Sequence, residues 1–234
     1  MRNCVTSGDS GLAIRGIEAY HSGMNSTFLP VAEQDIREAL RAHLVRTARA
    51  GAVVRDEMNA GDARVDLARI GHQLEGFEIK SDADTLGRLA RQIAEYGLLF
   101  DTVTLVAGVT LFQEAAERVP EWWGLIRATC DRGSAVTLTE VRRPMPNPGQ
   151  SVDALTRLLW RDEAALALSE LSGLKAAKSA SAKALRSKVA RNVPLHMVKP
   201  WVLSKVVNPT RLADWQTTLG ALRRPPLQGG MHPG

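Results

Sequence analysis

Residues 102–109, Thr-Val-Thr-Leu-Val-Ala-Gly-Val, form a continuous run of apolar and β-branched side chains. A strand with one face in water alternates polar and apolar residues, whereas a continuous run is typical of a strand buried on both faces. Covering both faces of a sheet requires helices on each side. The run therefore predicts an α/β fold rather than an all-β or all-α one.

The periodicity of the flanking segments predicts the other elements of this fold. Ile36, Leu40 and Leu44 recur at helical spacing, and Gly51 is a plausible stop signal for that helix. The expected helices cover residues 33–50, 83–99 and 111–118, and the expected strands cover 52–58, 64–70, 74–80, 102–109, 123–128 and 135–142. The order α-β-β-β-α-β predicts a mixed sheet.

A proline-rich segment, Arg-Arg-Pro-Met-Pro-Asn-Pro-Gly at residues 142–149, predicts a boundary, because three prolines in five residues continue neither a helix nor a central strand. Beyond it we expect helices over 152–171 and 180–191, and a third over either 199–206 or 210–222. The predicted organisation is a flexible N-terminal arm (1–30), a core (31–143), a basic helical lobe (151–222) and a disordered tail (223–234).

Composition excludes several classes of protein. No apolar run approaches the roughly 18–20 residues that a membrane span needs, and the N-terminus is polar where a signal peptide is apolar. Two cysteines, Cys4 and Cys130, are too few for a disulfide framework, and the five histidines are too scattered for a zinc cluster. We therefore expect a cytoplasmic protein without a membrane partner.

Lys80 is the only lysine among the first 174 residues, which contain 18 arginines. The pKa of a lysine responds to its surroundings, whereas an arginine stays protonated, so a lone lysine beside the carboxylate of Glu78 suggests chemistry. Successive strand residues point to opposite faces, so Glu78 and Lys80 share one face while Phe77 and Ile79 face the other. An isolated Glu-x-Lys spacing is more often an ordinary surface pair.

Asp66 lies on the preceding strand and is expected beside Glu78, where two carboxylates repel each other unless a cation holds them. Mg²⁺ takes one or two carboxylates and keeps several waters, so it fits such a pair. Lys80 could then orient or deprotonate a water, or stabilise charge on a phosphate. In this reading Val65 and Leu67, on either side of Asp66, both belong with the core.

Three further residues support this site from the helices. Gln92 and Tyr96 are four residues apart, hence neighbours on the face turned toward the sheet, although a packed tyrosine with an incidental glutamine would look the same. Glu33 projects within about 20° of the apolar stripe of its helix, from where it could bind the metal. An acidic residue at a helix N-terminus is also favoured by the helix dipole alone.

In this order, Asp66, Glu78-Ile79-Lys80 and Gln92-Ile93-Ala94-Glu95-Tyr96 resemble the D…ExK…QxxxY pattern of PD-(D/E)XK nucleases, specifically the RecB-like branch. The resemblance covers about residues 31–110. Residues 78–86, with Trp122-Trp123-Gly124 further on, are also similar to little-characterised bacterial and phage members of this superfamily. Val65 stands where the proline that names the superfamily would be.

The resemblance implies a restriction-endonuclease-like αβββαβ core that hydrolyses DNA phosphodiester bonds with Mg²⁺ or Mn²⁺. By it, the Asp66 and Glu78 carboxylates and the Ile79 carbonyl are metal ligands. Lys80 assists the attacking water, and Gln92 and Tyr96 support the substrate and the site. RNA is not excluded as a substrate, and protein partners are unknown.

The basic half of the chain predicts a polyanion-binding surface. Residues 151–234 carry 13 basic and 5 acidic residues, and residues 175–191 carry six basic residues and no acidic one. Such a segment can contact phosphates without reading bases. The candidate DNA-binding residues are Arg88, Lys175, Lys178, Lys183, Arg186, Lys188 and Arg191. A lysine-rich solvated surface is the alternative.

The sequence therefore predicts a metal-dependent deoxyribonuclease. Two other functions remain open: a nuclease-fold protein that binds DNA without cleaving it, and a regulatory protein whose basic lobe binds a partner.

Overall fold

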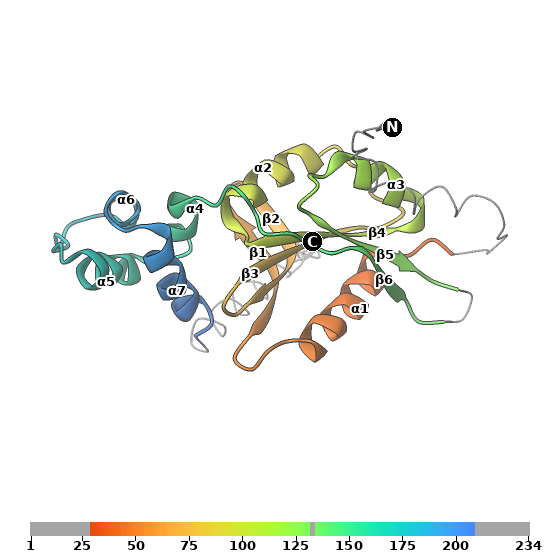
Figure 1. Ribbon diagram of the computed structural model, residues 1–234, viewed down its shortest axis with the longest axis horizontal. Coiled ribbons are helices and arrows are strands. Elements are labelled where there is room, and N and C mark those ends of the chain that lie inside the picture. The colour runs from red at the N-terminus through yellow and green to blue at the C-terminus, as the bar shows by residue number, and fades with distance from the viewer. Residues whose placement is uncertain (1–28, 132–133, 209–234) are drawn as a thin grey trace, which may run out of the picture.

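The computed structural model describes residues 29–131 and 134–208, and it has an α/β fold with a mixed sheet. The predicted arm and tail lie almost wholly outside these residues. Six strands form the sheet in the order β1-β2-β3-β4-β5-β6 (Figure 1). Their bounds are β1 Val53–Ala60, β2 Ala63–Ile70, β3 Leu74–Lys80, β4 Thr102–Gly108, β5 Gly124–Thr129 and β6 Thr137–Arg142. Each lies within two residues of its predicted range.

Helices cover both faces of the sheet, and the order of elements along the chain is the predicted αβββαβ. Helix α1 (Glu33–Arg46) packs on one face through its buried residues Ile36, Leu40 and Leu44. Helices α2 (Leu89–Leu99) and α3 (Val109–Arg118) cover the other face (Figure 1). Strand β4 pairs in parallel with β3 and β5, and all of its residues but the first are buried. The continuous apolar run is therefore a central strand.

Strands β2 and β3 separate halfway along their length. Their antiparallel pairing runs from Ile70–Leu74 to Leu67–Phe77 and stops there, although both strands continue. Beyond that point the side chain of Asp66 accepts the hydrogen bond from the Ile79 amide, at 2.7 Å. The two strands thus open a gap between their ends, and a carboxylate occupies the place of a ladder partner.

The predicted alternation around Asp66 is wrong in one respect. Val65 belongs to the apolar cluster on the α2 side, whereas Leu67 belongs to the cluster on the α1 side. The alternation of β2 is therefore broken at Asp66. Opposite it on β1, Glu57 has a left-handed backbone (φ 52°), which interrupts the regular pleat of that strand as well.

The helix predicted over 83–99 begins only at Leu89. Asp84 accepts hydrogen bonds from the amide and the hydroxyl of Ser81, at 2.7 and 2.6 Å, and so closes a turn directly after β3. Short polar side chains compete in this way with the helical pattern for backbone groups. The delayed start leaves a loop between Lys80 and α2.

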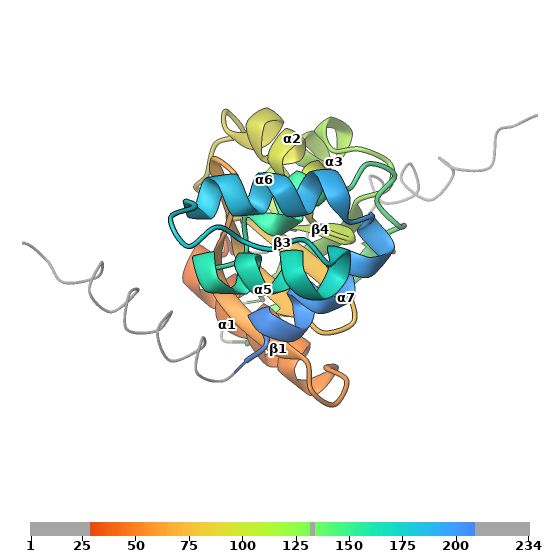
Figure 2. The same ribbon diagram turned by 90° about the vertical axis from the view of Figure 1, so that its left-hand side faces the viewer.

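The C-terminal part is helical, as predicted, with α4 Val152–Thr156, α5 Arg161–Ser172, α6 Ala182–Asn192 and α7 Leu195–Val206. The helix expected over 152–171 is divided, because the Trp160 amide donates to Glu163 (2.7 Å) and starts a new helix there. Of the two alternatives for the third helix, α7 covers 199–206, and 210–222 lies outside the described residues. Figure 2 shows α5, α6 and α7 from the end of the molecule.

The proline-rich linker attaches these helices firmly to the core. The Asn147 side chain donates to the Gly97 and Phe100 carbonyls, both at 2.7 Å, and the Ser151 amide donates to the Leu98 carbonyl at 2.8 Å. These bonds satisfy carbonyls at the C-terminal end of α2, which otherwise lack partners. The buried residues of α4–α7 form one apolar cluster with the α2 face of the sheet. The lobe is therefore continuous with the core.

Candidate active site

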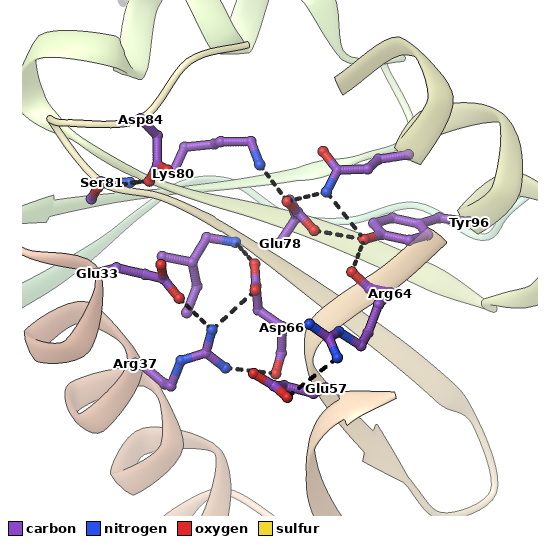
Figure 3. Close-up of polar contacts among 12 residues, drawn as sticks. Glu33, Arg37, Glu57, Arg64, Asp66, Glu78, Lys80, Ser81, Asp84 and Tyr96 are labelled. Carbon is purple, nitrogen blue, oxygen red and sulfur yellow. Dashed lines mark hydrogen bonds and ion pairs between the residues drawn. The ribbon is translucent and has the colours of Figure 1, made fainter. Parts of the chain in front are cut away.

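A cleft of about 570 Å³ lies where β2 and β3 separate. Figure 3 shows part of its lining, with α1 below and the sheet and α2 above. Six acidic and five basic side chains line it, and every predicted catalytic or metal-binding residue except Tyr96 is among the lining residues. The lining is Glu33, Arg37, Glu57, Asn59, Gly61, Asp62, Ala63, Arg64, Asp66, Glu78, Ile79, Lys80, Asp84, Arg88, Arg91 and Gln92.

Glu78 is at the centre of a buried hydrogen-bond network. The side chain of Lys80 donates to Oε1 of Glu78, and Nε2 of Gln92 donates to the same oxygen at 2.5 Å. The hydroxyl of Tyr96 lies 2.7 Å from Oε2. All four side chains are at least nine-tenths buried. The predicted grouping of an acid and a lysine from β3 with two residues of α2 is therefore present (Figure 3).

Burial raises the pKa of Glu78 to about 7, and the charge of Asp66 adds to this rise. The ammonium of Lys80 and the hydroxyl of Tyr96 act in the opposite direction but do not cancel it. Burial and the nearby Glu78 carboxylate likewise raise the pKa of Tyr96, which therefore stays a neutral phenol. The two carboxylates repel each other in a region with little water, so this part of the cleft favours an added cation.

Asp66 faces the α1 side of the gap and is held by both of its oxygens. Oδ2 accepts from the Ile79 amide at 2.7 Å, and Oδ1 accepts from Arg37 at 3.0 Å. Burial raises the pKa of Asp66, while the Ile79 amide and the charge of Arg37 act to lower it. Asp66 and Glu78 thus approach the gap from its two sides.

Site residues also satisfy the backbone groups that the strand separation leaves free. The Ile79 amide is bound by Asp66, and the Arg64 carbonyl lies 2.7 Å from the Tyr96 hydroxyl. The Asp66 carbonyl accepts from Nη1 of Arg37 at 2.9 Å. A buried polar group without a partner costs about 1–3 kcal/mol, so these side chains stabilise the open strand ends as well as forming the cleft.

Glu33 lies at the cleft but is about half exposed rather than turned inward as predicted. It accepts from Nη2 of Arg37 at 2.5 Å, and the same nitrogen donates to Asp66. Arg37, with only 12% of its side chain exposed, therefore lies between the two carboxylates. The spacing of four residues on one helix brings Glu33 and Arg37 together.

The side-chain oxygens in the cleft suit a hard cation that has few protein ligands and keeps several waters. Asp66 and Glu78 offer two carboxylates, and Oε1 of Gln92 is a buried acceptor for which the described residues supply no donor. No group of three or more His, Cys, Asp or Glu side chains within residues 29–131 and 134–208 is placed to hold a metal ion together. Two carboxylates plus water suit Mg²⁺ or Mn²⁺ and not a zinc or calcium cage. The residues therefore fit the predicted cofactor.

Two arginines from the start of α2 border the same cleft. Arg88 is exposed at the N-cap position, and Arg91 donates to the Asp62 carbonyl across the cleft mouth. With Arg64, which pairs loosely with Glu57 at 3.6 Å, they place positive charge around the acidic centre. Arg88 was predicted to bind nucleic acid, and its position at the rim is compatible with that.

The basic residues of the lobe are not part of the cleft. Five of the six are exposed, whereas Arg186 is partly buried and donates to the Leu159 carbonyl, which gives it a structural contact. Helix α7 packs near the turn that precedes β3, and Lys199 on α7 pairs with Asp101. Lys80 is at the other end of β3, about 20 Å away for a strand of this length. The exposed residues are Lys175, Lys178, Lys183, Lys188 and Arg191.

Arg37 and Glu57 are two of the cleft residues that sequence reasoning missed. Arg37 had a detectable signal, namely its position four residues after Glu33 on the same helix face. Glu57 had none, because its role depends on a left-handed backbone in the middle of a strand. Such a conformation costs about 1–3 kcal/mol in a residue other than glycine and is often found at functional sites.

Comparison with known proteins gives a family and little beyond it. The family model described as bacteriophage P4 protein cII matches residues 28–209. Among curated proteins none matches significantly. A solved structure, the SPO1766 protein of unknown function from Silicibacter pomeroyi, is 18% identical, with 86% of this chain and 98% of that one covered. The TM-score of this match is 0.40. No described helix is both long and apolar enough to cross a membrane.

Proposed function

The chain belongs to the family of bacteriophage P4 protein cII, and we propose that it is a Mg²⁺- or Mn²⁺-dependent nuclease that hydrolyses DNA phosphodiester bonds. One observation carries the proposal. Asp66, Glu78 and Lys80 line one cleft between separated strands, with Gln92 beside them and Tyr96 bonded to Glu78. This arrangement supports the proposal, because the resemblance to RecB-like PD-(D/E)XK nucleases implies a site built from these residues.

The chemistry is addition of water to phosphorus with loss of an ester oxygen. Asp66, Glu78 and the Ile79 carbonyl would hold the divalent ion, which would supply Lewis acidity for the hydrolysis. Nζ of Lys80, oriented by Oε1 of Glu78, donates to the attacking water or to a phosphate oxygen. The attacking water gives a proton to the solvent as the new P–O bond forms and the bond to the leaving sugar oxygen breaks, and that oxygen takes up a proton from the solvent.

Gln92 and Tyr96 act as positioning residues in this scheme. Both hydrogen-bond to Glu78, and Tyr96 also binds the backbone of β2, so together they fix the carboxylate relative to both strands. A displaced carboxylate can reduce the rate about 100-fold, because catalysis depends on sub-ångström placement. Arg88 and Arg91 at the cleft rim provide contacts for the phosphates on either side of the cleaved bond.

A cleavage assay with matched variants tests the proposal. Supercoiled plasmid and linear duplex are incubated with protein and Mg²⁺ or Mn²⁺. We expect cleavage by the wild type and its loss in Asp66→Asn and Lys80→Met. Lys199→Met is the control, because it removes a second lysine–carboxylate pair at the opposite end of the sheet. Equal cleavage by wild type and Lys80→Met, or loss only in Lys199→Met, would contradict the assignment.

A second candidate is a nuclease-fold protein that binds DNA without cleaving it. The observation that favours it is that each oxygen of Asp66 and Glu78 already has a hydrogen-bond partner in the protein. Such a site is stable without a metal. Salt-dependent DNA binding by the wild type, with no cleavage under any metal tested, would favour this candidate over the enzyme.

A further inference from the structure

We propose that Arg37 is a built-in cation that limits the cleft to a single divalent ion, held on the Glu78 side of Asp66, and that Glu33 anchors Arg37 instead of binding metal. This inference rests on the proposed metal-dependent function and specifies it further. It concerns how many ions the cleft takes and which carboxylates hold them. The contacts of Arg37 are its basis.

Arg37 connects helix α1 with strand β2 through three contacts. Its Nη2 donates to Glu33 at 2.5 Å and to Oδ1 of Asp66 at 3.0 Å, and its Nη1 donates to the Asp66 carbonyl at 2.9 Å (Figure 3). The side chain is largely buried, and a guanidinium cannot lose its proton. One fixed positive charge therefore fills the space between Glu33 and Asp66.

A divalent ion bridging Glu33 and Asp66 would have to take the place of this guanidinium or lie next to it. Like charges at such short range repel strongly where water is scarce. No three acidic side chains of the described residues are grouped to share an ion, so Glu33 does not complete a triad with Asp66 and Glu78. The α1 side of Asp66 is already neutralised by the protein itself.

The other side of Asp66 differs in charge balance. Asp66 and Glu78 place two carboxylates at the same cleft, and the single point charge of Lys80, on a flexible stem, contacts only one oxygen of Glu78. The unpaired Oε1 of Gln92 provides a further acceptor on the same side. An ion placed here relieves the repulsion between the two carboxylates, because the guanidinium of Arg37 lies on the other side of Asp66. The geometry therefore assigns one position for the ion, between these two carboxylates.

Metal stoichiometry tests this directly, with readouts that do not depend on cleavage. Mn²⁺ is titrated calorimetrically into the full chain, and electron paramagnetic resonance reports whether two ions are spin-coupled. For the wild type we expect one Mn²⁺ per chain and no coupled signal. In Glu33→Gln, whose amide oxygen can still accept from Arg37, the Kd should change by less than about threefold.

Removing the guanidinium should open the second position. Arg37→Met should bind two Mn²⁺ with a coupled signal, and the double variant Arg37→Met/Glu33→Gln should return to one. Two ions in the wild type, or a tenfold weaker Kd in Glu33→Gln, would overturn the inference while leaving the nuclease proposal intact. No Mn²⁺ binding at all would refute both. If Arg37→Met fails to fold, the wild-type and Glu33→Gln measurements still decide.

Discussion

The buried carboxylate of Glu78 should make the protein lose stability as pH rises, and Glu78→Gln should remove that loss. Burial raises the pKa of Glu78 from 4.5 to about 7, so the folded chain holds this proton more tightly than the unfolded chain does. Between these two pH values the folded state binds more protons, and the free energy of unfolding therefore falls with increasing pH. The loss amounts to about 3 kcal/mol and is complete above about pH 7.

Glu78→Gln suits this test because the amide can keep the network. Its oxygen can accept from Lys80 and Gln92, and its NH₂ can donate to Tyr96, which then donates to the Arg64 carbonyl. The variant has no proton to lose at this position. Its stability relative to the wild type should therefore improve by about 3 kcal/mol between about pH 4.5 and pH 8.

Urea unfolding at several pH values, without divalent ions, measures the difference. Trp123 is a suitable fluorescent probe, because it is fully buried and stacks on Tyr96 with ring centroids 6.0 Å apart. The raised pKa of Asp66 also makes the free energy of unfolding fall as pH rises. This fall occurs in both proteins, so it largely cancels in the difference between them. Parallel stability curves for wild type and Glu78→Gln over this range would refute the reasoning that Glu78 is held protonated in the fold.

Three further predictions follow from contacts of the cleft, linker and lobe. Tyr96→Phe removes the hydroxyl that lies 2.7 Å from both the Arg64 carbonyl and Oε2 of Glu78, so it should cost about 1–3 kcal/mol in urea unfolding and move the Glu78 titration to higher pH; an unchanged titration would contradict the role of the hydroxyl. Asn147→Ala removes two hydrogen bonds to the end of α2 and should lower the free energy of unfolding by about 2 kcal/mol, checked by thermal melting. Charge reversal at Lys183 and Lys188 should reduce the slope of log Kobs against log salt for DNA binding by about 2, whereas Arg143→Glu, at an exposed position directly after β6, should not.

Charge reversal is preferable to truncation for testing the lobe. The buried residues of α4–α7 share one apolar cluster with the sheet, and the linker holds the end of α2. Removing residues 151–234 would expose part of the core, so a loss of DNA binding in the truncated chain would not identify the lobe as the binding surface.

The sequence was most informative where one physical signal dominated. The double-sided burial of residues 103–108 follows from the continuous apolar run, and the face shared by Glu78 and Lys80 follows from the strand period. Both are confirmed. The grouping of Gln92 with Tyr96 follows from the helical period in the same way. The apolar run could therefore predict the fold class, and periodicity the α2 side of the cleft.

The α1 side of the cleft depends on exceptions to periodicity. Alternation fails at Asp66, because strands β2 and β3 separate there and β1 has a left-handed residue at Glu57. The helical period predicted that Glu33 faces the core, whereas in the structure its side chain contacts Arg37 and is half exposed at the rim of the cleft. The secondary-structure propensity of a single residue does not indicate where two strands separate. That depends on side chains distant in the sequence, which hydrogen-bond to the backbone groups of the separated strands.

The most direct test of the central claim is the rate of phosphodiester cleavage in DNA by the wild type and by Lys80→Met, each with Mg²⁺ or Mn²⁺ and each shown to be folded. The account predicts metal-dependent cleavage by the wild type that EDTA abolishes, and a rate at least 100-fold lower in Lys80→Met, in line with the loss of a group that acts on the reacting water. Equal rates in the two proteins, or no cleavage by the wild type with either metal, would contradict it.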